Sequence, residues 1–442
     1  MMQAFHWDCP RVDGREGAWW SYVREKVPDL ARAGFTMLWL PPVHKAGNVG
    51  GASMGYDPYD YYDLGEFDQK GGVETWFGSR DELLRLIETA HGHGLQLVAD
   101  IVINHNNGAD AQEASPVDGQ LRWTRFQPKS GRFPRNFECF HPSVYESWDE
   151  NTFGQMPDLV HRNPYVFDQI LQLARWLVEE IGFDGFRYDF VKGYGSWMIT
   201  AIQEFRYQRG GSRFKPYGVG ENWSSARTIK NWFREVNAWT DNPVDAFDFP
   251  LRDMLKELCD RYGFSLRGFT TWETFSRHEA ENAVTFVENH DLRQDSSRIH
   301  HDKLLAYGYV LTHEGYPCVF WKDYYNEGLA GAGTPHGIDA LVWAHETFAG
   351  GGTDVLWVDD DLYVMQRRGS GDKPGLVFVL NNRGDRWNGS WVTTQWHDVA
   401  FTPVGWWSGS DLAPPEDQWA SSDGRAQFWA PPRGYAVYAP RV

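Results

Sequence analysis

The sequence predicts an α/β protein: a closed (β/α)₈ TIM barrel with a small domain inserted after its third strand and a C-terminal antiparallel β-sandwich domain. Two observations predict the barrel: short strand-like runs recur along the chain, and amphipathic helical stretches lie between and after them. A third observation predicts the sandwich, because helical periodicity ends after Gly352 and alternating strand patterns take its place.

The predicted barrel strands cover residues 2–6, 36–40, 95–103, 185–188, 217–220, 246–249, 283–287 and 318–321. The clearest helices cover residues 79–92, 164–181 and 303–312. Ser79 suits an N-cap, and Pro164 suits a first helical turn. An open doubly wound sheet is the rival arrangement, but no glycine-rich dinucleotide-binding loop follows the first strand.

The domain boundaries follow from two breaks in this rhythm. Residues 104–161 are rich in Pro, Asn, Gly and aromatic residues and contain no strong helix, and segments of this length are usually functional loops or small domains. We therefore expect the barrel to take residues 1–103 and 162–351, with the inserted domain at 104–161. Residues 352–442 form the predicted C-terminal β domain, with strands at 362–367, 376–380 and 435–438.

The composition limits the possible function classes. The formal net charge of −18 argues against nucleic acid, which requires basic patches, and it gives anionic membranes no attraction. No apolar run approaches the length of a membrane span. Aromatic residues make up 16% of the chain and include 23 Trp. They either fill the core or form flat platforms for sugar rings, and the sequence leaves both interpretations open.

The cysteines and the first residues bear on the cellular compartment. Cys9, Cys139, Cys259 and Cys318 are widely separated, which predicts structural thiols and leaves a single bridge as the alternative. The first residues lack the basic region of a signal peptide. We expect a monomer in the cytoplasm, with a trimmed secreted form as the alternative.

Three carboxylates follow predicted barrel strands. Asp189 follows the fourth strand, Glu221 the fifth and Asp291 the seventh. Catalytic groups of such barrels lie at the carboxyl ends of the strands. Single strand-end acids often cap helices or form ion pairs, but three of them with polar neighbours favour a catalytic cluster. Retaining glycoside hydrolysis uses one ionised carboxylate as nucleophile and one protonated carboxyl as acid and then base.

Neighbouring residues indicate which carboxylate has which role. Arg187 lies two residues before Asp189 and shares its strand face, so its guanidinium favours the ionised form that a nucleophile requires. Glu221 has no basic neighbour in the sequence, which is compatible with the protonated role. His105 and His290 can donate hydrogen bonds to sugar hydroxyls.

Short motifs occur in order along the chain, at residues 55–60, 64–67, 100–105, 156–159, 185–194, 218–223 and 286–291. Together they resemble the α-amylase family of retaining glycoside hydrolases, and the pattern is closest to archaeal and plant-like members. There are departures. Gly193 stands where many relatives have His, Glu288 replaces a commoner Asp, and Gly220 stands where Ala is usual, while residues 110–146 diverge.

The resemblance implies a role for each residue of the cluster. Asp189 would be the nucleophile, Glu221 the general acid/base, and Asp291 the group that stabilises the distorted sugar at the cleavage point. By the same resemblance, the substrate-binding residues are Tyr56, His105, Arg187, Lys192, Trp223 and His290, with Tyr56 stacking on the sugar and Lys192 on the leaving-group side. Core packing for Tyr56 and a solvated charge for Lys192 are the alternatives.

The resemblance also implies a calcium ion. The implied ligands are side-chain oxygens of Asn104, Asp149 and Asp158 and backbone carbonyls of Asn151 and Gly193. Calcium prefers such oxygen ligands, and the ion would hold the inserted domain against the barrel beside Asp189. The alternative for Asp149 and Asn151 is that they only shape a loop.

The expected activity is endo-acting hydrolysis of α-1,4-glucosidic bonds in starch, glycogen or maltodextrins. An exo-acting or transglycosylating relative is the first alternative, and a non-catalytic glucan-binding protein is the second. A phosphate-binding barrel enzyme would require glycine-rich loops that this sequence lacks. The C-terminal domain either covers a barrel face or binds starch through tryptophans such as Trp406 and Trp407, and we favour the first.

Overall fold

The centre of the chain is a closed ring of parallel strands, which confirms the predicted barrel. The computed structural model describes residues 1–48, 52–146, 153–410 and 413–441. Around the ring the strand order is β1-β14-β13-β12-β11-β8-β5-β2. The strands are β1 (Met2–Gln3), β2 (Met37–Leu40), β5 (Gln96–Ile101), β8 (Gly185–Tyr188), β11 (Tyr217–Gly220), β12 (Asp245–Phe247), β13 (Ala283–Phe286) and β14 (Tyr316–Phe320).

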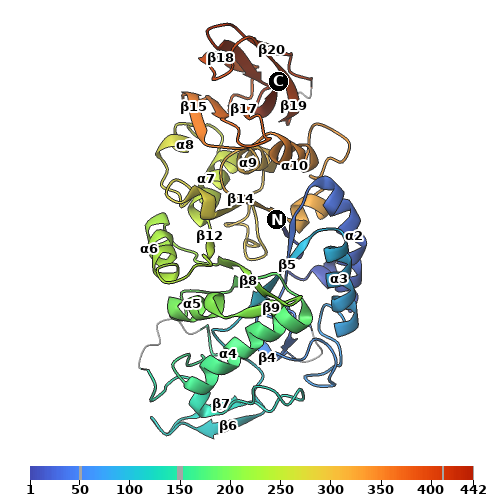
Figure 1. The fold of residues 1–442 in the computed structure, drawn as a ribbon, viewed down its shortest axis with the longest axis vertical. Helices are drawn as coiled ribbons and strands as arrows, with labels where there is room; N and C mark the ends of the chain where they lie inside the picture. Colours follow the sequence, from blue (N-terminus) through green and yellow to red (C-terminus); the bar gives the residue numbers. More distant parts are fainter. Residues whose placement is uncertain (49–51, 147–152, 411–412, 442) are drawn as a thin grey trace.

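Helices surround the barrel strands in Figure 1. They are α2 (Trp19–Ala33), α3 (Arg80–Gly92), α4 (Pro164–Trp176), α5 (Ser196–Glu204), α6 (Ala226–Val236), α7 (Phe249–Asp260), α9 (Lys303–Val310) and α10 (Ile338–Thr347). Ser79 caps α3 in a reciprocal capping box with Glu82. Pro164 occupies the first turn of α4, where its missing N–H costs nothing.

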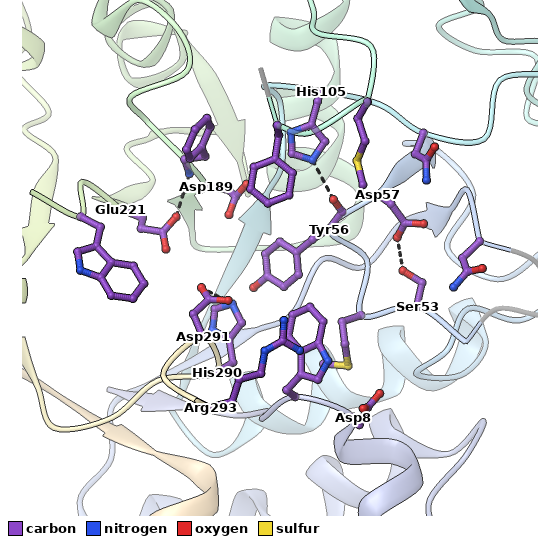
Figure 2. A pocket seen from close by; sticks show the side chains of 18 of the residues that line it. Asp8, Ser53, Tyr56, Asp57, His105, Asp189, Glu221, His290, Asp291 and Arg293 are labelled. Atoms are coloured by element: carbon purple, nitrogen blue, oxygen red, sulfur yellow. Dashed lines mark hydrogen bonds and ion pairs between the residues drawn. The ribbon is translucent and has the colours of Figure 1, made fainter. Parts of the chain in front are cut away.

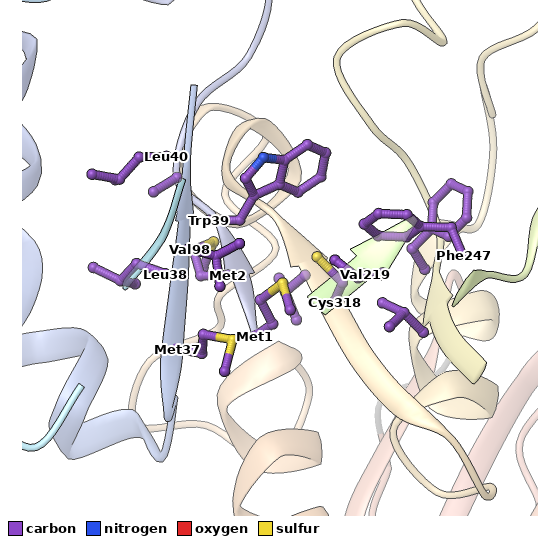
Figure 3. Close-up of a cluster of buried hydrophobic side chains, with 14 of the residues drawn as sticks. Met1, Met2, Met37, Leu38, Trp39, Leu40, Val98, Val219, Phe247 and Cys318 are labelled. Atoms are coloured by element: carbon purple, nitrogen blue, oxygen red, sulfur yellow. The ribbon is translucent and has the colours of Figure 1, made fainter. Parts of the chain in front are cut away.

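The barrel interior is filled by apolar side chains from several strands. Figure 3 shows Met37 and Trp39 from β2, Val98 from β5, Val219 from β11 and Cys318 from β14 in one cluster. All five are buried. A filled interior makes the barrel a rigid support, so polar side chains can function only at the strand ends.

In its described residues, the segment that follows β5 has little regular structure. It contains a hairpin of β6 (Ala111–Ala114) and β7 (Leu121–Arg125) and a short 3₁₀ helix, Phe137–Cys139. The hairpin lies at the opposite end of the molecule from the C-terminus (Figure 1). Backbone hydrogen bonds tie the end of the insertion to the end of β5: Leu159 N donates to Asn104 O at 2.8 Å, and Asn106 N donates to Pro157 O at 3.0 Å.

The C-terminal part of the chain forms two antiparallel sheets. The larger has the order β15-β16-β17-β22-β19-β20 and the smaller pairs β18 with β21. Their bounds are β15 (Thr353–Val358), β16 (Leu362–Arg367), β17 (Leu376–Asn381), β18 (Asn388–Thr393), β19 (Val399–Ser408), β20 (Gln418–Ala420), β21 (Arg425–Ala430) and β22 (Gly434–Pro440). Side chains of both sheets, among them Val379 and Phe428, share one buried cluster, as in a sandwich.

Polar contacts fasten these sheets to the barrel. The Arg433 guanidinium donates to the Leu258 carbonyl at 2.7 Å and the Cys259 carbonyl at 2.9 Å, and it pairs with Asp302 at 2.9 Å. Trp407 packs against the barrel core, while Trp406 packs in the sandwich. Both tryptophans are therefore partly buried by packing, which supports the interpretation that the domain covers the barrel.

Two smaller expectations concern the cysteines and membranes. All four cysteines are buried free thiols, so no disulfide forms. Within the described ranges, no helix has both the length and the apolar character that crossing a membrane requires.

Candidate active site

A cavity of about 1060 Å³ opens at the carboxyl ends of the barrel strands. Asp189, Glu221 and Asp291 all line it, and Figure 2 shows their side chains facing the same space. The remaining candidates for substrate binding that line it are Tyr56, His105, Lys192, Trp223 and His290. The structure thus brings together residues that are separated by up to 235 positions in the sequence, from Tyr56 to Asp291.

Arg187 connects the acidic residues of the cavity floor. Its Nη1 lies 2.7 Å from Asp189 Oδ1 and 2.9 Å from Asp100 Oδ1, and its Nη2 lies 2.9 Å from Glu221 Oε1. The guanidinium is 1% exposed, so these pairs are not screened by water. Two carboxylates on one guanidinium lie close together, which fits the short carboxylate separation of retaining enzymes.

The strand register explains why Arg187 reaches these partners. In the parallel ladder Arg187 of β8 is opposite Asp100 of β5 on one side and Val219 of β11 on the other. Asp189 follows two residues later on the same face. Glu221 follows the end of β11, beyond Gly220, whose added Cβ would collide with the Trp232 ring. Glycine at this position therefore lets α6 pack closely against the strand that carries Glu221.

Burial raises the pKa values of the carboxyl groups on Arg187. Loss of solvent raises the pKa of Asp189 to about 7 and that of Glu221 to about 7, although the charge of Arg187 opposes both shifts. The negative charge of Asp189 raises the pKa of Glu221 further. Burial also raises the pKa of Asp100 to about 6. Close carboxyl groups of this kind titrate as a set, so they keep a shared proton to a higher pH than a free carboxyl group would.

The backbone also contacts Glu221. Phe190 N, directly after Asp189, donates to Glu221 Oε2 at 3.0 Å (Figure 2). Phe190 has a φ of 45°, a left-handed conformation that is uncommon for a bulky side chain. This turn aims the Phe190 amide at Glu221, so one carboxylate oxygen is held by the amide and the other by Arg187.

Asp291 is positioned by a histidine and a glutamine. His290 Nε2 lies 3.3 Å from Asp291 Oδ2, and His290 Nδ1 lies 2.9 Å from Gln3 Nε2. Burial lowers the pKa of His290 to about 4, so the ring is neutral. Because Gln3 Nε2 donates to Nδ1, the ring proton belongs on Nε2, where it donates to Asp291.

Tyr56 and His105 form the part of the cavity wall next to His290. Tyr56 Oη donates to Asp100 Oδ2 at 2.7 Å, and its ring lies parallel to His290 with 5.0 Å between centroids. His105 Nε2 donates to the Tyr56 carbonyl at 2.9 Å. Burial lowers the pKa of His105, so the neutral ring has a single N–H, and this proton holds Tyr56 in place.

Lys192 and Trp223 lie together beyond Glu221. Lys192 Nζ donates to the Trp223 carbonyl at 3.0 Å. Trp223 is 42% exposed, and its ring stacks on Phe249 with 5.0 Å between centroids. An exposed indole that is held in place by a second aromatic ring is a suitable surface for a sugar ring to stack on.

Glu288, one of the departures from the family pattern, has contacts that stabilise the loop carrying Asp291. Its carboxylate is buried, accepts from Ile299 N and lies 3.3 Å from Arg252 Nη2. Arg252 also donates to Ser297 O. These contacts fasten both ends of the loop that carries Asp291, so Glu288 supports the site from outside the cavity.

The structure describes three of the five residues implied as calcium ligands: Asn104, Asp158 and Gly193. Asn104 is buried, and its Oδ1 has no hydrogen-bond partner among the described residues. A Cβ on Gly193 would collide with this oxygen. Asp158 is also buried and pairs with His105, next to Asn104, in a β-bridge. Asp149 and Asn151 lie outside the described residues. No group of three or more His, Cys, Asp or Glu suited to a metal occurs in the part of the chain that is described.

Several residues in the cavity or in contact with its wall had no role in the sequence prediction. Asp100 was part of a motif but received no role, although it binds both Arg187 and Tyr56. Trp7, Phe153 and Arg293 also line the cavity and were not predicted. Trp7 directly follows the first predicted strand, and this strand-end position could have identified Trp7 as a cavity residue.

Comparisons with known proteins show the family of this chain. A family model described as "Alpha amylase, catalytic domain" matches residues 13–323. The chain is 32% identical over 431 residues to an alpha-amylase of Geobacillus stearothermophilus, covering 85% of this chain and 75% of that protein. It is 29% identical over 457 residues to the cytoplasmic alpha-amylase of Escherichia coli, covering 87% and 88%.

The fold agrees with solved structures. An alpha-amylase of Geobacillus thermoleovorans, complexed with acarbose, superposes with a TM-score of 0.71 at 20% identity, over 96% of this chain and 93% of that one. The family model covers most of the barrel and all three cavity carboxylates. The chain therefore belongs to the alpha-amylase family of glycoside hydrolases.

Proposed function

We propose that the cavity cleaves internal α-1,4-glucosidic bonds of starch, glycogen or maltodextrins by double displacement, with Asp189 as nucleophile and Glu221 as acid/base. The single observation that carries this proposal is the Arg187 guanidinium, which binds both carboxylates at 2.7 and 2.9 Å. Arg187 opposes the rise in pKa that burial causes in both carboxyl groups. We assign the ionised form to Asp189 and the proton to Glu221, as the resemblance of their motifs to the family implies.

The first half of the reaction forms a covalent intermediate. Asp189 Oδ attacks the anomeric carbon, and the bond between that carbon and the glycosidic oxygen breaks. Glu221 gives its proton to the departing oxygen, so the leaving sugar chain departs as an alcohol and the glucosyl group stays on Asp189 in the β configuration. Asp291, oriented by His290, hydrogen-bonds the sugar at this carbon as it flattens and becomes positively charged.

The second half reverses these roles. The Glu221 carboxylate now takes a proton from water, and the water oxygen attacks the anomeric carbon. The bond to Asp189 breaks, which restores the ionised nucleophile and releases an α-anomer. Arg187 contacts the side chains of both Asp189 and Glu221, and it would keep their separation similar in the two steps.

The direct test uses soluble starch with the purified protein. Viscosity, new reducing ends and the anomeric form of the products are followed together. We expect viscosity to fall rapidly while few reducing ends appear, with α-anomers released, because internal cuts shorten a polymer most per bond. Slow thinning with one short product would instead identify an exo-acting or transferring enzyme. Absence of cleavage of starch and of maltodextrins would leave only glucan binding.

We also propose that calcium binds beside Asp189. Asn104 Oδ1 and the Asp158 carboxylate would provide side-chain ligands, the Gly193 carbonyl a backbone ligand, and Asp149 and Asn151 would complete the set. The buried, unpaired Asn104 oxygen supports this, because such an atom is costly to leave unsatisfied. The ion would supply no chemistry to the reaction, and it would fasten the insertion to β5.

Removing calcium is expected to lower the melting temperature. An ion that binds only the folded chain stabilises it by about 2.7 kcal/mol when present at 100 times its Kd. Calorimetry with and without a strong chelator measures the difference, and added calcium should restore it. Asn104→Ala should melt at a lower temperature in calcium and lose most of the response to chelator. An unchanged melting temperature after complete chelation would rule out the ion.

Two further proposals concern the state of the protein. We propose a cytoplasmic location, which the similarity to a cytoplasmic alpha-amylase of Escherichia coli supports. The monomeric state stays a prediction, and light scattering of the purified chain measures it directly.

A further inference from the structure

Arg293 has an unusual place at the edge of the cavity. It lies two residues after Asp291, and its guanidinium carbon is 3.6 Å from the centroid of the Trp7 ring. Both residues line the cavity. The indole plane of Trp7 is nearly parallel to the rings of Tyr56 and His290, at interplanar angles of 10° and 4°. The stacked pair therefore continues the wall formed by Tyr56 and His290.

The Arg293 guanidinium has unused hydrogen-bonding capacity. Within the described ranges no side chain or carbonyl accepts a hydrogen bond from it, although its backbone N donates to Asp291 O at 2.9 Å. A guanidinium stacked on an indole keeps its N–H groups in its own plane, where they point outward. The stacking restricts the side chain, so less conformational entropy is lost when a ligand binds. Asp8, which also lines the cavity, adds a carboxylate acceptor nearby (Figure 2).

The position of Arg293 relative to Glu221 indicates which part of a bound glucan chain would reach Arg293. Glu221 protonates the departing oxygen, so the leaving chain extends past Glu221 toward Lys192 and Trp223. In Figure 2, Arg293 and Asp8 lie on the other side of Asp291 from Glu221. Sugars there belong to the part of the substrate that stays attached to Asp189 after the first step.

We infer that Arg293, stacked on Trp7, binds a glucosyl unit of the retained part of the substrate and thereby influences the length of the fragment released from it. This inference rests on the proposed function. The stacked guanidinium donates to sugar hydroxyls, and Asp8 accepts from them. A neutral polyhydroxylated ligand suits a site that offers both donors and acceptors beside a flat aromatic wall.

The experiment compares wild type with Arg293→Ala and Arg293→Lys on maltohexaose that carries a label at its reducing end. Binding modes that place a sugar on Arg293 are weakened in Arg293→Ala, so fewer glucose units should lie on the retained side. The labelled product is then expected to become longer by at least one glucose unit. KM should rise about tenfold, a loss of about 1.4 kcal/mol, while kcat changes less than threefold.

Arg293→Lys separates stacking from charge. Lysine keeps the charge but lacks the planar group, so its cleavage pattern should lie close to that of Arg293→Ala. Arg85→Ala is the matched control, because Arg85 is an exposed arginine on α3 outside the cavity, and it should keep the wild-type pattern. An unchanged pattern and KM in Arg293→Ala, with active wild type, would overturn the inference. Inactive wild type would instead contradict the proposed function.

Discussion

Replacing Asp189 with asparagine is expected to lower kcat/KM on maltoheptaose by about 10⁴-fold, because the amide cannot attack the anomeric carbon. Asparagine has the same shape and keeps an oxygen for the contact with Arg187 Nη1, now 2.7 Å from Asp189 Oδ1. The fold should therefore persist. Rapid quenching followed by mass spectrometry should detect a glucosylated Asp189 in the wild type and no such adduct in the variant.

Asp245→Asn is the matched control for this variant. Asp245 begins β12, hydrogen-bonds Asn282 at 2.9 Å and has its pKa raised to about 6 by burial, but it does not line the cavity. The same chemical change should leave turnover within about threefold of wild type. If Asp189→Asn kept a tenth or more of the activity while correctly folded, Asp189 would not be the nucleophile.

Replacing Glu221 with glutamine is expected to lower kcat on starch by 10²- to 10⁴-fold, the usual contribution of a general acid/base. Glutamine keeps the shape of the side chain, so maltooligosaccharide should still bind, which calorimetry measures. Substrates that need no protonation separate the two steps. An α-maltosyl fluoride should regain the first step in this variant, and added azide should take over the second and yield an α-glycosyl azide. Asp189→Asn should regain neither step.

The pH dependence gives a second test of Glu221. Its pKa is raised to about 7, and the first step requires the protonated form. Activity on starch should therefore fall as the pH rises through about 7, whereas an ordinary glutamic acid would already be ionised at lower pH. With α-maltosyl fluoride and azide, Glu221→Gln should lack this alkaline fall. Persistence of the same fall in Glu221→Gln would assign it to another group.

The carboxylates could be found from the sequence because each lies at the end of a strand with a clear local pattern. β8 and β11 occur at the predicted residues, 185–188 and 217–220. The alternation of side chains along β8 correctly placed Arg187 on the face of Asp189. These features depend on neighbouring residues, whose preferences the sequence shows directly.

The partners of these residues could not be found in the same way. Asp100 lies opposite Arg187 because β5 and β8 pair in that register, and a shift of one residue would turn Asp100 to the other face. Gln3 orients His290 although the two residues lie 287 positions apart in the sequence. The left-handed turn at Phe190, which aims its amide at Glu221, has no sequence signal either.

The sequence by itself determined the class of fold, the order of its elements and the three carboxylates, because strand and helix patterns and strand ends are local properties. Only the tertiary structure decided how these groups act together. It placed Asp100, Asp189 and Glu221 around one buried guanidinium and set Arg293 on Trp7 beside them. The physical reason is that pKa values and ligand contacts depend on burial and on pairing between distant strands, which closure of the barrel alone establishes.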